Sequence, residues 1–325
     1  MTALVEFKQV HRSFELRNPA KLFGGKRALH AVQDVSFEIA PGQTLGLVGE
    51  SGCGKSTVGK LVLGLLAPTG GEVRFDGAAL CANPKDPAWR AQRRDMQMIF
   101  QNPFGALNPR LSIGRQMREV LDTHDIGAAD ERAEEVAALM RAVGLAPQMQ
   151  DRYPHQMSGG QLQRVVIARA LAVSPRFLVC DEAVAALDVS IQAQVVNLLQ
   201  DIQEERNLTY LFISHDLEII RHISDRIVVM YLGRVVEVGT AQAVFEASRH
   251  PYTRALIAAA PNPVPGARKD EPLLEGDPPS PLDPPSGCVF RTRCRHAQPA
   301  CGERIPDLAS VGGDHAVACI RSHEI

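Results

Sequence analysis

The sequence predicts an α/β fold with a mostly parallel sheet, an antiparallel β part, an inserted helical subdomain and a small C-terminal cysteine-rich module. Three observations support this prediction. Short apolar runs alternate with helical stretches through residues 44–213, as in sheets whose strands are joined by helices. Between about residues 104 and 156, strand signals stop and amphipathic helical patterning takes over. Four of the seven cysteines lie within the last 38 residues.

Length and composition are those of a globular protein with about two domains. The 325 residues are 22% charged and 45% hydrophobic, which argues against wholesale disorder. The net charge of -2 gives no reason to expect nucleic acid as a partner. The sequence has neither the roughly 18 to 20 consecutive apolar residues of a membrane-spanning helix nor the regions of a signal peptide. We therefore expect a cytosolic chain that reaches a membrane only through partner proteins.

The elements follow one another in a recognisable order. A half-buried strand at 35–39 and a Pro41-Gly42 turn lead into a buried strand at 44–48, a glycine-rich loop and a helix at 55–66. Further strands are expected at 96–100, 177–180 and 210–213, a helix at 130–143, and a hairpin at 227–238 with Gly233 near its turn. We divide the chain into a main domain at 1–250, a helix and proline-rich linker at 251–287, and the cysteine module at 288–325.

The glycine-rich loop matches the phosphate-binding pattern G-x-x-x-x-G-K-S/T. Its glycines let backbone N–H groups converge on phosphates, Lys55 reaches the terminal phosphates, and the Ser56 hydroxyl can ligate Mg²⁺. The alternative is a glycine-rich turn with an incidental lysine, but the strand before the loop and the helix after it favour ATP binding. The expected ATP-binding residues here are Gly49, Glu50, Ser51, Gly52, Cys53, Gly54, Lys55, Ser56 and Thr57.

Polar residues after three other strands supply the second half of a hydrolytic site. Asp181 is expected to hold Mg²⁺ and Glu182 to act as general base on the attacking water. Gln101 is expected to contact the metal, the water and ATP, and His215 is expected as a second catalytic residue that contacts the terminal phosphate and the attacking water. Each has a purely structural alternative, because carboxylates after strands and the Ser214-His215-Asp216 segment can serve only as helix caps. Their combination with a phosphate loop favours catalysis.

One further segment carries a family resemblance. Ser158, Gly159, Gly160 and Gln161 begin a helix and resemble the signature of ABC transporter ATPases. The resemblance implies an ABC-type P-loop ATPase core in which two subunits pair head to tail, so that the signature of one caps the ATP of the other. It also implies that Asp188 lies in the D-loop, the segment after the Asp181-Glu182 pair in this family. Phe14 would stack on the adenine, and the alternative is a strand residue that faces the core. Ala183 and Ala185 depart from the Pro and Ser usual in this subgroup, which puts in doubt how the two ATP sites communicate.

The C-terminal third is similar to dipeptide and oligopeptide importer ATPases, on residues 249–253 and 281–288. The stretch 16–30 is more similar to the second of their two ATPase subunits, often designated the F-type subunit of dipeptide permease. The resemblance implies a heterodimer with a related ATPase, two membrane permease subunits, an extracytoplasmic binding protein, and a place at the cytoplasmic face of the bacterial inner membrane. Nickel, glutathione or sugars remain alternative cargoes, and a DNA-repair, chromosome-organising or translation-associated ATPase is the alternative function.

The four C-terminal cysteines have the spacing C-x5-C-x6-C-x17-C: Cys288, Cys294, Cys301 and Cys319. Four thiolates can hold zinc or an iron–sulfur cluster. The importer resemblance includes members with a 4Fe-4S cluster at matching cysteines, so we expect that cluster, with zinc or metal-free thiols as alternatives. Arg291, Arg293 and Arg295 either offset thiolate charge or form a solvated face.

Overall fold

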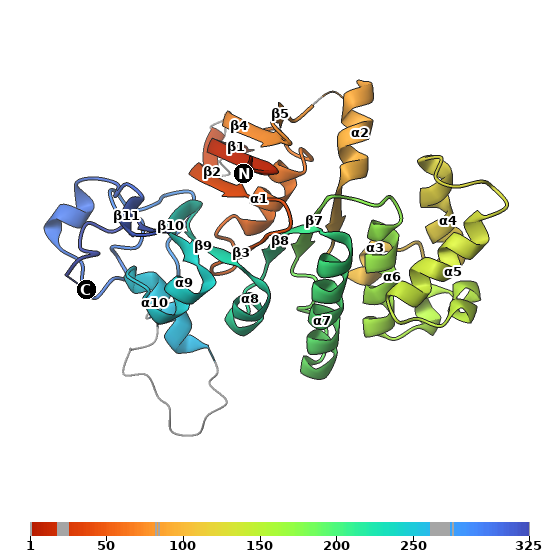
Figure 1. The fold of residues 1–325 in the computed structure, drawn as a ribbon. Coiled ribbons are helices and arrows are strands. Elements are labelled where there is room, and N and C mark those ends of the chain that lie inside the picture. Colours follow the sequence, from red (N-terminus) through yellow and green to blue (C-terminus); the bar gives the residue numbers. More distant parts are fainter. Residues whose placement is uncertain are drawn as a thin grey trace. The chain divides into compact units, whose positions relative to one another are not determined.

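The computed structural model describes residues 2–17, 26–81, 83, 85–260, 274 and 276–324 (Figure 1). The chain divides into two compact units. The first unit contains Met1–Ile39, Thr44–Ala79 and Ser214–Ile325, and the second contains Ala40–Gln43 and Leu80–Ile213. Most of the stretch 16–30 and of the proline-rich linker lies outside the described residues.

In the first unit, an antiparallel sheet has the strand order β2-β1-β4-β5. It consists of β1 (Val5–Arg17), β2 (Lys26–Ile39), β4 (Gly70–Phe75) and β5 (Ala78–Ala79). Strand β2 is much longer than the predicted 35–39, because its first half pairs with the end of β1 as far as Arg17↔Lys26. The alternation of buried and exposed residues places Phe7 and Phe37 in the core, where their rings stack at 4.8 Å.

The first unit also holds strands of a mixed sheet, and the phosphate loop follows the first of them in the chain. Here β3 (Thr44–Val48) runs parallel to β9 (Arg226–Tyr231), which pairs antiparallel with β10 (Arg234–Thr240). Leu232 and Gly233 have φ values of 45° and 79° in the tight turn between β9 and β10, which confirms the predicted hairpin. The unit's helices are α1 (Lys55–Val62), α8 (Leu217–Ile223), α9 (Ala241–Glu246) and α10 (Pro251–Ala259).

Helix α1 ends four residues before the predicted Leu66. Gly64 has φ 60° and its N–H bonds the carbonyl of Leu61, while the amides of Leu65 and Leu66 both bond the carbonyl of Lys60. This left-handed glycine is the usual stop at a helix C-terminus. The apolar run through Leu66 suggested a longer helix, but Gly64 was the decisive signal.

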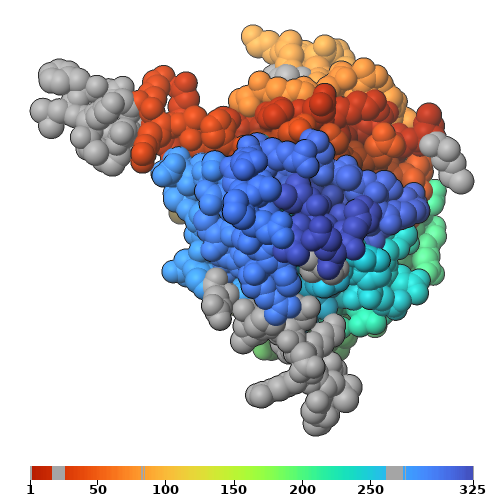
Figure 2. Space-filling view, turned by 90° about the vertical axis from the view of Figure 1, so that its left-hand side faces the viewer, coloured from red at the N-terminus to blue at the C-terminus, as the bar shows by residue number. Residues whose placement is uncertain are grey.

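The C-terminal module extends the mixed sheet. Its strand β12 (His315–Val317) pairs antiparallel with β10 and with β11 (Ala309–Gly312), and a short 3-10 helix, η3 (Pro299–Gly302), precedes them. Figure 2 shows these last residues, in blue, as a surface that adjoins the red N-terminal strands. The N-terminal strands and the C-terminal module therefore belong to one unit.

The second unit contains three parallel strands that pair in the order β8-β7-β6. These are β6 (Met96–Ile99), β7 (Phe177–Asp181) and β8 (Thr209–Ile213), each within one residue of its predicted bounds. Every residue of β7 and β8 is buried, as is typical of parallel strands covered on both faces. The longer helices of this unit outside residues 104–156 are α2 (Pro87–Asp95), α6 (Gly159–Leu171) and α7 (Val189–Arg206).

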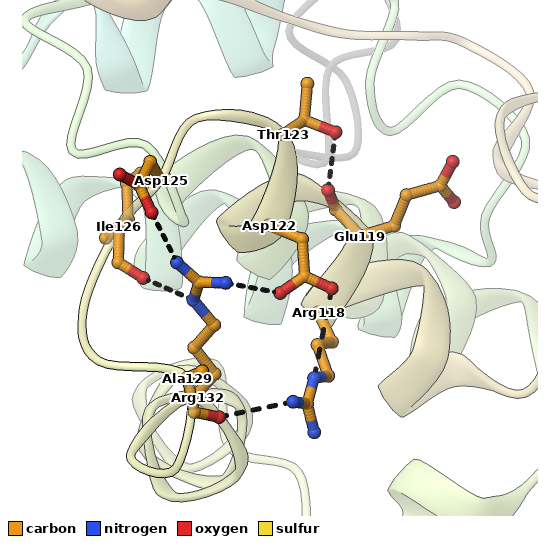
Figure 3. Close-up of polar contacts among 8 residues, drawn as sticks. All are labelled: Arg118, Glu119, Asp122, Thr123, Asp125, Ile126, Ala129 and Arg132. Atoms are coloured by element: carbon orange, nitrogen blue, oxygen red, sulfur yellow. Dashed lines mark hydrogen bonds and ion pairs between the residues drawn. The ribbon is translucent and has the colours of Figure 1, made fainter.

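Between β6 and α6 the described chain is helical. It forms α3 (Pro103–Ala106), α4 (Ile113–Thr123), α5 (Arg132–Ala142), η1 (Pro147–Asp151) and η2 (Pro154–Gln156). Arg132 fastens the loop between α4 and α5, as Figure 3 shows. Its guanidinium bonds Asp122 at 2.7 Å, Asp125 at 2.8 Å and the carbonyl of Ile126 at 2.9 Å. No helix among the described residues is both long and apolar enough to cross a membrane.

Candidate functional site

The phosphate loop joins β3 to α1, in the context that the sequence predicted. Gly49, Gly52 and Gly54 have φ values of 155°, 79° and 108°. A Cβ on Gly49 would lie 2.2 Å from the carbonyl oxygen of Met230, and one on Gly54 would lie 2.3 Å from that of Ala31. Glycine is thus required at both positions, because the loop is pressed against backbone on two sides.

Lys55 is the first residue of α1 and is only 5% exposed. Its ammonium donates to the carbonyls of Gly49 at 2.7 Å and Glu50 at 3.0 Å, and so closes the loop on itself. Cys53 is buried in the same loop, and that burial raises the pKa of its thiol. Gly54 caps α1 without a side-chain hydrogen bond, so the amides of the first helical turn face the loop.

In the second unit, the structure brings Gln101 and Glu182 together. The Gln101 amide donates to the Glu182 carboxylate at 2.5 Å, and Asp181 ends β7 with 8% exposure. Glu182 has φ 49°, a left-handed conformation that is costly for a non-glycine residue. Its N–H bonds the carbonyl of Ile213 at 2.9 Å, which fixes the residue at the end of the sheet. The motif gave no sign of this strained backbone.

The signature segment is a helix start with reciprocal capping. The Ser158 hydroxyl accepts from the N–H of Gln161 at 3.4 Å, and the Gln161 side chain accepts from the N–H of Ser158 at 3.1 Å. Gly160 is packed so closely that a Cβ there would lie 2.6 Å from Ile191, and one on Gly159 would lie 3.6 Å from Leu187. Asp188 is the N-cap residue of α7. The signature and the Asp188 segment are therefore neighbours in the second unit.

His215 and Phe14 lie in the first unit. His215 directly precedes Asp216, whose carboxylate caps α8 by accepting from the N–H groups of Glu218 and Ile219. The capping role that the sequence left open thus belongs to Asp216. Phe14 is half-buried on β1, and the guanidinium carbon of Arg12 lies 4.6 Å from the centre of its ring. One face of that ring is already covered by a cation.

The four C-terminal cysteines lie close enough to influence one another. The pKa of Cys288 is raised to about 11, chiefly by burial and to a smaller extent by the neighbouring Cys319, Cys301 and Cys294. Burial also raises the pKa of Cys294 and Cys319, and the charge of Arg321, which the sequence did not single out, opposes that rise. All seven cysteines in the described part of the chain are free thiols. Within that part, no group of three or more His, Cys, Asp or Glu residues is arranged so that it could hold a metal ion.

Arg293 has neither of the roles predicted for it. Its guanidinium forms a forked ion pair with Glu50 of the phosphate loop, at 2.6 and 3.1 Å, and its side chain is 6% exposed. This pair raises the pKa of Arg293. Arg291 instead bonds the backbone and hydroxyl of Ser286. Nothing in the sequence links Glu50 to Arg293, which are 243 residues apart.

Comparison with known proteins identifies the family. The chain is 48% identical to the oligopeptide transport ATP-binding protein OppF of Haemophilus influenzae, over 98% of this chain and 97% of that one. It belongs to the ABC transporter family. It is also 50% identical to the putative peptide import ATP-binding protein BOV_A0347 of Brucella ovis, over 95% of this chain and 97% of the relative. The family model for ABC transporters matches residues 32–185, and that for the oligopeptide/dipeptide transporter C-terminal region matches residues 236–301.

Solved structures confirm the expected ABC-type ATPase core of this family member. One is cbiO1 from Clostridium perfringens, part of the ABC transporter complex cbiONQ, with a TM-score of 0.64 and 26% identity over 76% of this chain and 93% of that one. Another is the ATP-binding cassette MJ0796 in a dimeric post-hydrolysis state bound to ADP and Pi, with a TM-score of 0.64 and 29% identity over 73% and 98%. ATP binding and the use of Mg²⁺ are general to such ATPases.

Proposed function

We propose that this ABC protein is the ATP-hydrolysing subunit of a transporter that imports peptides, in which ATP binding closes a pair of such subunits and hydrolysis reopens them. The observation that carries the proposal is the near full-length similarity to ATP-binding proteins named for oligopeptide transport. The match to the C-terminal region of oligopeptide and dipeptide transporters supports the same assignment.

In this proposal the phosphate loop holds the ATP. Amides of residues 49–57 donate to the phosphates, and Lys55 exchanges its bonds to the Gly49 and Glu50 carbonyls for phosphate oxygens. Phe14 offers the ring face opposite Arg12 to the adenine. Ser56, Gln101 and Asp181 would hold Mg²⁺, which supplies charge neutralisation at the phosphates. The hydroxyl, amide oxygen and carboxylate of this set suit a hard cation that prefers oxygen ligands.

Hydrolysis is assigned to Glu182. Its carboxylate takes a proton from a water molecule as the water oxygen attacks the terminal phosphorus, and the bond to the ADP oxygen breaks. The Gln101 amide, already bonded to this carboxylate at 2.5 Å, holds it in place, and His215 would contact the terminal phosphate. The capped helix start at Ser158 to Gln161 would close over the ATP of a partner subunit, with Asp188 beside it.

The partners and location follow from the family. We place the protein at the cytoplasmic face of a bacterial inner membrane, bound to two permease subunits that receive cargo from an extracytoplasmic binding protein. A related second ATPase completes a heterodimer. Peptides are the proposed cargo, and nickel, glutathione and sugars are the alternatives that a transport assay distinguishes.

We also propose that the four cysteines hold a 4Fe-4S cluster. Their mutual effect on pKa supports a common site. Zinc is the alternative for four thiolates, and within the described residues no group of three or more His, Cys, Asp or Glu is arranged to hold a metal ion. Cys288, Cys294, Cys301 and Cys319 would supply the four thiolates that such a cluster takes. Iron and sulfide analysis with visible absorption of anaerobically purified protein tests this, and stoichiometric zinc would contradict it.

Transport is tested with the complex in liposomes. ATP turnover is measured with and without loaded binding protein, for the wild type, Glu182→Gln, and the control Glu204→Gln, which alters an exposed carboxylate on α7. We expect turnover to rise with peptide-loaded binding protein and to collapse only in Glu182→Gln. Turnover that responds to nickel, glutathione or sugar but not to peptide would contradict the cargo. Turnover indifferent to the membrane partners would contradict the transport function.

A further inference from the structure

Glu50, the second residue of the phosphate loop, is held at three points. Its carbonyl accepts from Lys55 at 3.0 Å, its N–H donates to the Tyr252 hydroxyl at 2.8 Å, and its carboxylate pairs with Arg293. Only the first of these bonds lies within the loop. The other two partners are 202 and 243 residues further along the chain. The conformation of the loop therefore depends on the C-terminal part of the first unit.

The contact from the C-terminal part is rigid. Tyr252 is fully buried, and its ring lies 4.7 Å from that of Tyr231 and 5.4 Å from that of Phe290. The Tyr231 hydroxyl also accepts from Arg293 at 3.4 Å. The Arg293 side chain is only 6% exposed, and moving its guanidinium away would break its bonds to both the Glu50 carboxylate and the Tyr231 hydroxyl.

Arg293 is positioned by the fold of the cysteine module. It lies between Cys288 and Cys294, and its N–H bonds the carbonyl of Phe290 at 3.0 Å. The N–H of Cys288 in turn bonds the carbonyl of Cys301 at 2.7 Å. The turn that presents Phe290 and Arg293 to the loop thus forms only when the segments around the cysteines are folded together.

We propose that the cysteine module is a clamp on the phosphate loop, with Arg293 as a positioning residue that acts through Glu50. The clamp does two things for ATP. It neutralises a carboxylate that would otherwise repel the phosphates, and it keeps the loop amides in one arrangement before ATP arrives. Arg293 touches no reacting atom, so its effect falls on ATP affinity and not on the chemical step. The inference rests on the proposed binding of ATP at this loop.

The test is a double-mutant cycle on the purified full chain, read by equilibrium binding of a fluorescent ATP analogue. Arg293→Met is expected to weaken binding by about fivefold or more, a typical coupling between sites. In a Glu50→Gln background, Arg293→Met should have little effect on binding of the analogue, because no carboxylate remains to be neutralised. Arg293→Lys should restore part of the affinity, since it keeps the charge but loses the fork. The matched control is Arg295→Met, which removes an exposed arginine that bonds His296 within the module.

Turnover in the complex separates positioning from simple stability. A clamp raises the KM for ATP and leaves kcat nearly unchanged, whereas partial unfolding lowers kcat at unchanged KM. Lys55→Ala tests the underlying assignment. Wild-type affinity in Arg293→Met, with binding lost in Lys55→Ala, would overturn the clamp and leave the ATP site intact. Unchanged binding in Lys55→Ala would overturn both. If Arg293→Met does not fold, the cycle is run with Arg293→Lys, and equal effects in both Glu50 backgrounds would refute the coupling.

Discussion

His250 makes the stability of the first unit depend on pH. It is 1% exposed at the N-cap of α10, where its Nδ1 accepts from the N–H of Tyr252 at 3.1 Å. The backbone N–H of His250 donates to the buried Glu237 carboxylate at 3.2 Å. Burial lowers the pKa of His250 from 6.5 to about 4, although the charge of Glu237 opposes that fall. The ring is therefore neutral in the folded protein at neutral pH.

The direction of the effect follows from the two pKa values. Below pH 6.5 the unfolded chain takes up a proton at this residue, while the folded chain does so only near pH 4. The free energy of unfolding consequently falls as the pH drops from 6.5 to 4 and levels off below that. Each pH unit in this window is worth about 1.4 kcal/mol. At pH 5 the loss from His250 alone is about 2 kcal/mol.

The matched variant is His250→Asn. Asparagine is a strong N-cap residue whose side-chain oxygen can accept from the N–H of Tyr252, but it does not titrate. Urea unfolding of both proteins, followed by circular dichroism at about pH 7.5 and about pH 5, gives the comparison. We expect the wild type to lose about 2 kcal/mol more than the variant on acidification. Equal losses in the two proteins would refute the reasoning, because all other titrating groups are shared.

Three further predictions concern the second unit. Arg132→Ala should lower the free energy of unfolding by about 1–2 kcal/mol and speed hydrogen exchange between α4 and α5, because one bond to α4 and two bonds to the loop are lost; unchanged exchange there would contradict it. Tyr210→Phe should lower thermal stability by about 1 kcal/mol, since the buried hydroxyl bonds the carbonyl of Leu199 at 2.9 Å, and an unshifted melting curve would argue against that bond. Ser158→Ala should lower the free energy of unfolding by about 1 kcal/mol and fray the first turn of α6, whereas Ser158→Asn should keep the cap. Equal hydrogen-exchange rates of that turn in the two variants would show that the cap contributes nothing.

The parts of the fold that the sequence predicted are those with local signals. Strands β3, β7 and β8 are buried along their whole length, and each therefore appears in the sequence as a nearly continuous apolar run. The phosphate loop, the signature and the Asp181-Glu182 pair follow fixed spacings next to such elements. Their positions could therefore be read directly from the sequence.

What the sequence could not predict depends on contacts between distant residues. The ion pair of Glu50 with Arg293 joins two charged residues whose neighbours in sequence gave no hint of a partner. The left-handed conformation of Glu182 is imposed by its bond to Ile213, on the neighbouring strand. The first half of β2 is exposed and mixed in polarity, and it is a strand only because β1 extends to pair with it.

The contact between the phosphate loop and the end of the chain bears on biosynthesis. During translation, residues 49–56 leave the ribosome long before Arg293, and the loop must wait for the last tenth of the protein before its carboxylate is paired. A nascent or prematurely terminated chain would then hold an unclamped loop with a weaker grip on ATP. Such a fragment would lack both Tyr252 and Arg293, so the amide and the carboxylate of Glu50 would lose the two partners that lie outside the loop.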